Sequence, residues 1–169
     1  TNIKMKKILK KKTIKEKEIK SEGEKIAIRN PKFDALSDID DMKILEENCL
    51  LNANYEEAIN YAEKVIRLAI KNEMDSYVHE QEEFMRKVAE KVQGLYFSAE
   101  IGESARMIKK IYDILIKSGK NYEAHEIFES FKKHHQNNPS FYYIPLIKEL
   151  IKKDKTEWLK YQILHQDEN

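Results

Sequence analysis

The side chains of this chain with the greatest capacity for chemistry are one cysteine and five histidines. Cys49 has no second cysteine with which to form an internal disulfide or a zinc-binding pair. None of the histidines belongs to an HExxH motif, and His125 stands alone in the stretch HEIFE. The four glycines are scattered and form no phosphate-binding loop. We therefore predict no metal site, no cofactor and no catalytic residue.

Local context favours structural roles for these groups. Cys49 follows Met42 and Leu45 on an apolar helical stripe, which predicts a buried packing residue rather than a nucleophile. His134 and His135 are expected near a helix C-terminus, where they would interact with its last carbonyl groups. Carboxylates are plentiful, but we expect all of them on solvated faces among lysines. No pair is therefore expected to be set apart for acid–base catalysis.

Charge is balanced over the chain but not along it. The 169 residues carry a formal net charge of +1, so no global field indicates a nucleic-acid partner. Residues 1–20 hold nine lysines against two glutamates, a net charge of +7, which leaves −6 on the remainder. No apolar run approaches the roughly 18–20 residues of a membrane span. A signal peptide is not expected, and the single cysteine fits a reducing, cytoplasmic location.

The basic segment, residues 1–34, is predicted to be a weakly ordered arm or hairpin. Residues 25–29 alternate like a strand and Ser21–Glu24 could form a turn, but an isolated hairpin is marginally stable in water. The arm is either a solvated linker or a segment that binds an anionic membrane surface. Nucleic acid is disfavoured because no aromatic side chains are interleaved for base stacking.

Apolar residues recur every three or four positions over residues 35–165, which predicts an all-α domain of six or seven helices in antiparallel hairpins. Ser37 or Asp38 is expected to cap its first helix. Thr156 is expected to cap a short last helix, separate from one at 146–152. Of the three aromatic residues 141–143, at least two are expected in the core. Residues 166–169 form a polar tail.

The segment Asp40–Met74 is expected to fold as two antiparallel helices joined by a very short turn at Asn52–Asn54. It resembles the tetratricopeptide repeat: Tyr55-Glu56-Glu57-Ala58-Ile59 is similar to the start of that repeat's second helix, and Leu45 matches its usual first-helix leucine. Glu46 and Ala62 depart from the pattern. A similar stretch ends at Ala124, which is 66 residues after Ala58 and close to two repeats of about 34 residues.

The resemblance implies a solenoid in which the first helix of each hairpin lines a concave, peptide-binding surface. The positions that would line it here are Lys43, Glu47, Leu50, Arg106, Lys109, Asp113 and Lys117. The basic members of this set could hold an acidic peptide, although an ordinary charged helix surface has the same composition.

From this resemblance we predict a non-enzymatic interaction module, an adaptor or scaffold that binds a partner peptide or helix in a groove between hairpins. One alternative is a regulatory or assembly subunit that forms an oligomer through an apolar helix face. The other is a small helical enzyme with an unrecognised site.

Overall fold

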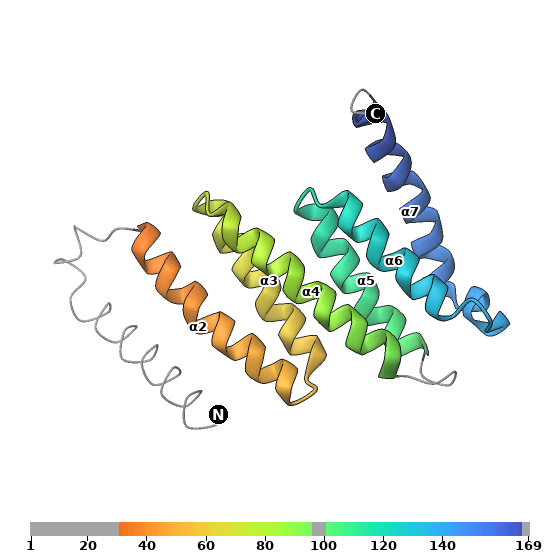
Figure 1. The fold of residues 1–169 in the computed structure, drawn as a ribbon, viewed down its shortest axis with the longest axis horizontal. Coiled ribbons are helices and arrows are strands. Elements are labelled where there is room, and N and C mark those ends of the chain that lie inside the picture. Colours follow the sequence, from red (N-terminus) through yellow and green to blue (C-terminus); the bar gives the residue numbers. More distant parts are fainter. Residues whose placement is uncertain (1–30, 96–100, 167–169) are drawn as a thin grey trace. The chain divides into compact units, whose positions relative to one another are not determined.

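A computed structural model describes residues 31–95 and 101–166, and within these ranges the chain is helical with no strand, which confirms the all-α prediction (Figure 1). The elements are α2 (Pro31–Leu51), α3 (Tyr55–Lys71), α4 (Asp75–Leu95), α5 (Ile101–Lys117), α6 (Asn121–His134), the 3-10 helix η2 (Pro139–Tyr143) and α7 (Pro145–Leu164). The predictions for residues 1–30 lie outside the described residues. The chain divides between His79 and Glu80, inside α4, into two compact units.

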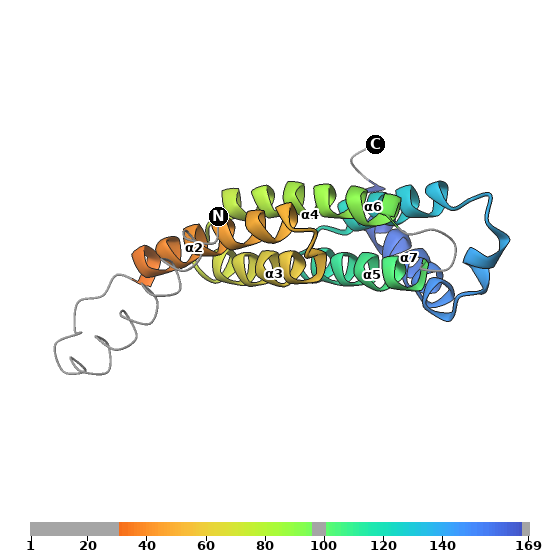
Figure 2. The ribbon, with the colours of Figure 1, turned by 90° about the horizontal axis from the view of Figure 1, so that it is seen from below.

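The N-terminal unit contains the predicted hairpin of α2 and α3 (Figures 1 and 2). Its core is formed by Ile39 of α2 with Val65 and Ala69 of α3, and Val78 at the start of α4 packs against them. Helix α2 begins at Pro31, so the cap predicted at Ser37 or Asp38 was wrong. Proline is tolerated in the first turn of a helix, where its missing N–H has no intrahelical acceptor to lose.

Three helices in the described chain end with the same left-handed turn. Each turn is closed by a 2.8 Å hydrogen bond from an N–H to the carbonyl five residues earlier: Asn54 to Cys49, Met74 to Ala69, and Lys120 to Leu115. The residue before each donor has a positive φ, of 56° at Ala53, 55° at Glu73 and 75° at Gly119. This is the Schellman arrangement, and of the three residues only glycine adopts it without a Cβ penalty.

The C-terminal unit contains the hairpin of α5 and α6, and α7 packs on both of these helices. Pro145 lies in the first turn of α7, as predicted. However, α7 is one helix of 20 residues, so the predicted break before Thr156 was wrong. The Thr156 hydroxyl donates back to the Lys152 carbonyl within the helix instead of capping a new one.

Only one of the three aromatic residues in η2 is buried, so the prediction of at least two was wrong. Phe141 is fully buried, whereas Tyr142 is 43% and Tyr143 76% exposed. A 3-10 helix turns once every three residues, so three consecutive side chains point in three directions. A single side chain of such a turn can therefore face the core.

The 66-residue interval between similar stretches of sequence also relates positions in the structure. Ala58 and Ala124 are both fully buried, and the left-handed turns at Ala53 and Gly119 are separated by the same interval. The interval carries the chain from α3 to α6, which is three helices further on. It is the length of a three-helix unit, so α5–α6–α7 follows α2–α3–α4 in the same order.

Candidate functional site

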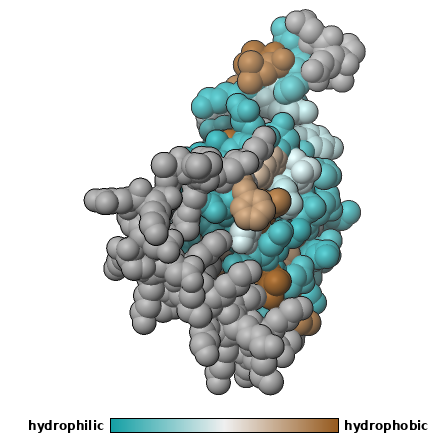
Figure 3. Space-filling view, turned by 90° about the vertical axis from the view of Figure 1, so that its left-hand side faces the viewer, coloured by the Kyte–Doolittle hydropathy of each residue, from teal (hydrophilic) through white to brown (hydrophobic). Residues whose placement is uncertain are grey.

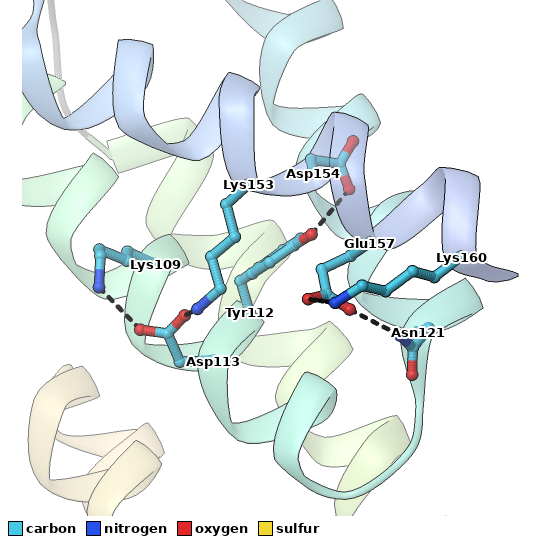
Figure 4. A network of polar contacts seen from close by, with 8 residues as sticks. All are labelled: Lys109, Tyr112, Asp113, Asn121, Lys153, Asp154, Glu157 and Lys160. Carbon is cyan, nitrogen blue, oxygen red and sulfur yellow. Dashed lines mark hydrogen bonds and ion pairs between the residues drawn. The ribbon is translucent and has the colours of Figure 1, made fainter.

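A buried polar network holds α7 against α5 and α6. Asp154 of α7 is only 4% exposed and accepts two hydrogen bonds, from the Tyr112 hydroxyl at 2.9 Å and from His125 Nδ1 at 2.8 Å. Figure 4 shows the Tyr112 hydroxyl pointing directly at this carboxylate. The His125 ring stacks on Trp158 with a centroid distance of 3.8 Å and an interplanar angle of 9°. The carboxylate is thus satisfied by two other helices.

The prediction that every carboxylate is solvated was wrong for Asp154, and also for Glu46 and Glu82, which are buried. Lysines flank Asp154 in the sequence, and that local pattern is typical of an exposed face. Its partners Tyr112 and His125 lie 42 and 29 residues earlier. No local signal could have found this contact.

Burial shapes the protonation of the network. Burial, reinforced by the neighbouring Asp154 carboxylate, raises the pKa of Tyr112 far above its usual value. The phenol therefore stays protonated and remains a donor at neutral pH. A charged carboxylate accepting from it forms one of the stronger classes of buried hydrogen bond.

Two of the predicted site residues, Lys109 and Asp113, lie one turn apart on α5. They form an ion pair with each other, and their side chains are only partly exposed to solvent. Lys109 Nζ lies 2.8 Å from Asp113 Oδ2, and Lys153 of α7 pairs with the other oxygen (Figure 4). Burial alone would raise the pKa of Asp113, but the hydrogen bonds from the two lysines outweigh it and lower the pKa. The ion pair of Asp113 with Lys153 is a second polar contact between α5 and α7, in addition to the hydrogen bond from Tyr112 to Asp154.

The other predicted residues lie on the faces of their own helices. Lys43, Glu47 and Leu50 belong to the N-terminal unit; Lys43 Nζ lies 5.3 Å from the centroid of the Tyr77 ring. In the C-terminal unit Arg106 is exposed and pairs with Glu103 at 3.0 Å, and Lys117 is exposed at the end of α5. The two sets belong to different units.

Cys49 is buried, as predicted. Burial, with smaller contributions from the carboxylates of Glu57 and Glu46, raises the pKa of its thiol. A raised pKa disfavours the thiolate, which is the nucleophilic form.

The His135 prediction was wrong for the side chain. The backbone N–H of His135 bonds the carbonyl of Phe131, but its buried ring stacks on Phe141 at 5.2 Å rather than facing the helix carbonyls. The interaction expected of its imidazole is made by its amide.

One group of three side chains in the described chain could hold a metal ion. His125 and Glu129, one turn apart on α6, and Asp154 on α7 each offer a ligand atom, and these atoms lie within 4.8 Å of one another. The histidine–aspartate pair is already hydrogen-bonded, and Tyr112 occupies the second oxygen of Asp154. The geometry as it stands is that of a structural anchor, because a metal ion would have to replace the histidine–aspartate bond.

The outward face of α7 carries exposed apolar side chains near its C-terminal end. Leu159 and Ile163, one turn apart, are 57% and 58% exposed, and Leu164 is 80% exposed. Figure 3 shows hydrophobic surface at its upper end, which is where α7 ends in Figure 1. The last helix thus presents leucine and isoleucine outward while Asp154 and Trp158 tie its inner face down.

Comparison with known proteins gave no matching family model, no similar curated protein and no similar solved structure. Within the described ranges, none of the helices has both the length and the apolar character that crossing a membrane requires. The site is therefore interpreted from its own geometry.

Proposed function

We propose that this chain is a non-enzymatic protein–protein interaction module, which binds a helix or peptide of a partner through the outward face of α7. The observation that carries the proposal is the pair Leu159 and Ile163, more than half exposed and one turn apart. Covering such a side chain fully contributes about 1.5–3 kcal/mol, so even partial burial of both gives a partner useful affinity.

The anchoring of α7 supports the same proposal. Its inner face is held by the Asp154 network and by the pairing of Lys153 with Asp113. Trp158 adds stacking contacts with His125 and with Tyr161. A surface fixed before binding loses less conformational entropy when a partner docks, which favours affinity.

The two predicted residues Lys109 and Asp113 fit this proposal in a changed role. Asp113 pairs with both Lys109 and Lys153 of α7, so these residues help to hold α7 in place. The proposed binding surface lies on α7 instead of α5. The binding of a partner helix, which the sequence analysis predicted, is kept, and only its location on the module changes.

The test compares the full chain with the double variant Leu159→Ser and Ile163→Ser as baits in quantitative affinity capture. Phe33→Ser is the matched control, because Phe33 is 68% exposed and lies on α2. Circular dichroism first establishes that all three proteins fold. We expect capture of a partner by the full chain and the control, and its loss from the α7 variant.

Equal capture by all three proteins would refute the proposal. Absence of any captured protein, together with self-association that the α7 variant abolishes, would point instead to the alternative of an oligomer-forming subunit.

A further inference from the structure

Helices α4 and α7 occupy corresponding places in the 66-residue repeat. Three buried positions of α4 have buried counterparts in α7 at this interval: Gln81 and Ile147, Phe84 and Leu150, Val88 and Asp154. The two helices therefore share one register of buried positions. The contacts that α4 makes through its other faces therefore indicate which contacts the corresponding faces of α7 could make.

A second face of α4 holds the next helical hairpin of the C-terminal unit. Arg86 pairs with Glu126 of α6 at 3.2 Å, and Glu82 pairs with Lys120 at 3.6 Å. Further along, Ser130 Oγ donates to Gln93 at 3.4 Å. Ala89 lies between these pairs and, with Ile127 of α6, lines a shallow depression of about 230 Å³. Alternating charged and small apolar contacts thus dock α6 onto α4.

The counterpart of this face on α7 is exposed. We call it the α7 docking stripe, and its residues, 66 positions after Glu82, Met85, Arg86, Ala89 and Gln93, are Lys148, Ile151, Lys152, Lys155 and Leu159. All are exposed except Ile151, which is half-buried. Lys148 Nζ lies 5.8 Å from the centroid of the Tyr143 ring, which holds it near the start of the stripe. The stripe combines three lysines with one exposed leucine.

We propose that the α7 docking stripe binds an acidic amphipathic helix of a partner protein, in the way that α4 holds α6. Lys152 replaces Arg86 and so takes a carboxylate at the position of Glu126. Lys148 replaces Glu82, which reverses the charge required at the position of Lys120. The partner therefore carries two acidic side chains six residues apart, one at the residue before its helix begins, as Lys120 precedes α6, and one within the helix. This inference rests on the proposed function and specifies the class of partner.

A second copy of this chain does not fit the stripe, because the corresponding hairpin lacks the required charges. The residues that lie 66 positions before Lys120 and Glu126 are Asn54, at the N-cap of α3, and Asn60 of α3, and neither is acidic. Lys64 lies at the position that corresponds to Ser130, where the stripe presents Leu159. Charge complementarity thus favours an acidic helix of another protein.

The probe is a synthetic helix that carries the predicted features. It is a hydrocarbon-stapled peptide of residues 117–134 with Lys120→Glu and Ser130→Leu, in which Phe128→Gln and Phe131→Gln make the α5-facing side polar. Its binding to the full chain is followed by fluorescence anisotropy at low and at physiological ionic strength. We expect saturable binding that weakens with salt, as opposite charges at a partly exposed contact require.

Charge exchange makes the experiment specific. We expect Lys152→Glu in the full chain to weaken binding at least threefold, and a peptide that also carries Glu126→Lys to restore it. Lys91→Glu, an exposed charge change on α4, is the matched control and should leave binding within twofold.

Failure of the peptide to bind, or equal effects of Lys152→Glu and Lys91→Glu, would overturn the acidic-helix inference. If the variant with Leu159→Ser and Ile163→Ser still loses its captured partner, the proposed function survives that failure. If the peptide fails and that variant still captures the partner, both the acidic-helix inference and the proposed function are refuted.

Discussion

Replacing Tyr112 by phenylalanine removes one hydrogen bond from the anchor of α7 and almost nothing else. The ring is fully buried and its hydroxyl donates to Asp154 Oδ1 at 2.9 Å. Phenylalanine fills the same space without creating a cavity, so the loss is that of a buried hydrogen bond to a carboxylate. Such bonds contribute about 1.5–3 kcal/mol. We expect Tyr112→Phe to lower the free energy of unfolding by about 2 kcal/mol.

Urea unfolding followed by tryptophan fluorescence measures this loss. Trp158 is the chain's one tryptophan and stacks on His125 within the same network, so its emission reports the docking of α7. With a slope of about 2 kcal/mol per molar urea, the expected midpoint falls by about 1 M. Tyr143→Phe, at a side chain 76% exposed, is the control and should stay within about 0.5 kcal/mol of the unchanged chain.

A double-mutant cycle decides whether the hydrogen bond is responsible. If the reasoning holds, Tyr112→Phe and Asp154→Asn share a coupling energy of about 1 kcal/mol or more. Additive effects, or a Tyr112→Phe protein as stable as the control, would refute the assignment of Asp154 as the anchor of α7. The apolar contacts of α7 would then carry its docking.

Two further predictions concern stability. Burial, together with the nearby His134 charge, lowers the pKa of His135, so the unfolded chain binds a proton more readily and stability is lost as pH falls below about 6.5. His135→Leu should reduce the drop in melting temperature between pH 7 and pH 5, and His134→Gln, which removes only the smaller cause, should reduce that drop less. Glu73 has a φ of 55°, so Glu73→Gly should raise the melting temperature by relieving about 1 kcal/mol of left-handed strain, whereas Gly119→Ala should lower it. A decrease with Glu73→Gly would mean that side-chain contacts of Glu73 outweigh the strain.

Structural features that depend on residues close together in the sequence were the predictable ones. Helix periodicity is local, so the α2–α3 hairpin, its turn at Asn52–Asn54 and the burial of Cys49 were all predictable. Helix starts were harder to predict: α2 begins at Pro31, about two turns before the expected caps, because proline in a first turn and a serine cap both satisfy the rules for helix starts. Each of these features depends on residues within a few positions of one another.

The amino-acid sequence by itself therefore determined the class of fold and the α2–α3 hairpin with its turn, since apolar spacing and turn residues act over one or two turns. The tertiary structure alone decided the roles of the polar residues. Asp154 lies among lysines in the sequence, which indicates a solvated position. It is buried because Tyr112 of α5 and His125 of α6 form hydrogen bonds with its carboxylate. Likewise, the sequence alone indicates a surface charge at Asp113, whereas in the folded chain its ion pair with Lys153 links α5 to α7. A polar side chain is stable in the interior only when distant partners satisfy it, and those partners are set by the packing of whole helices.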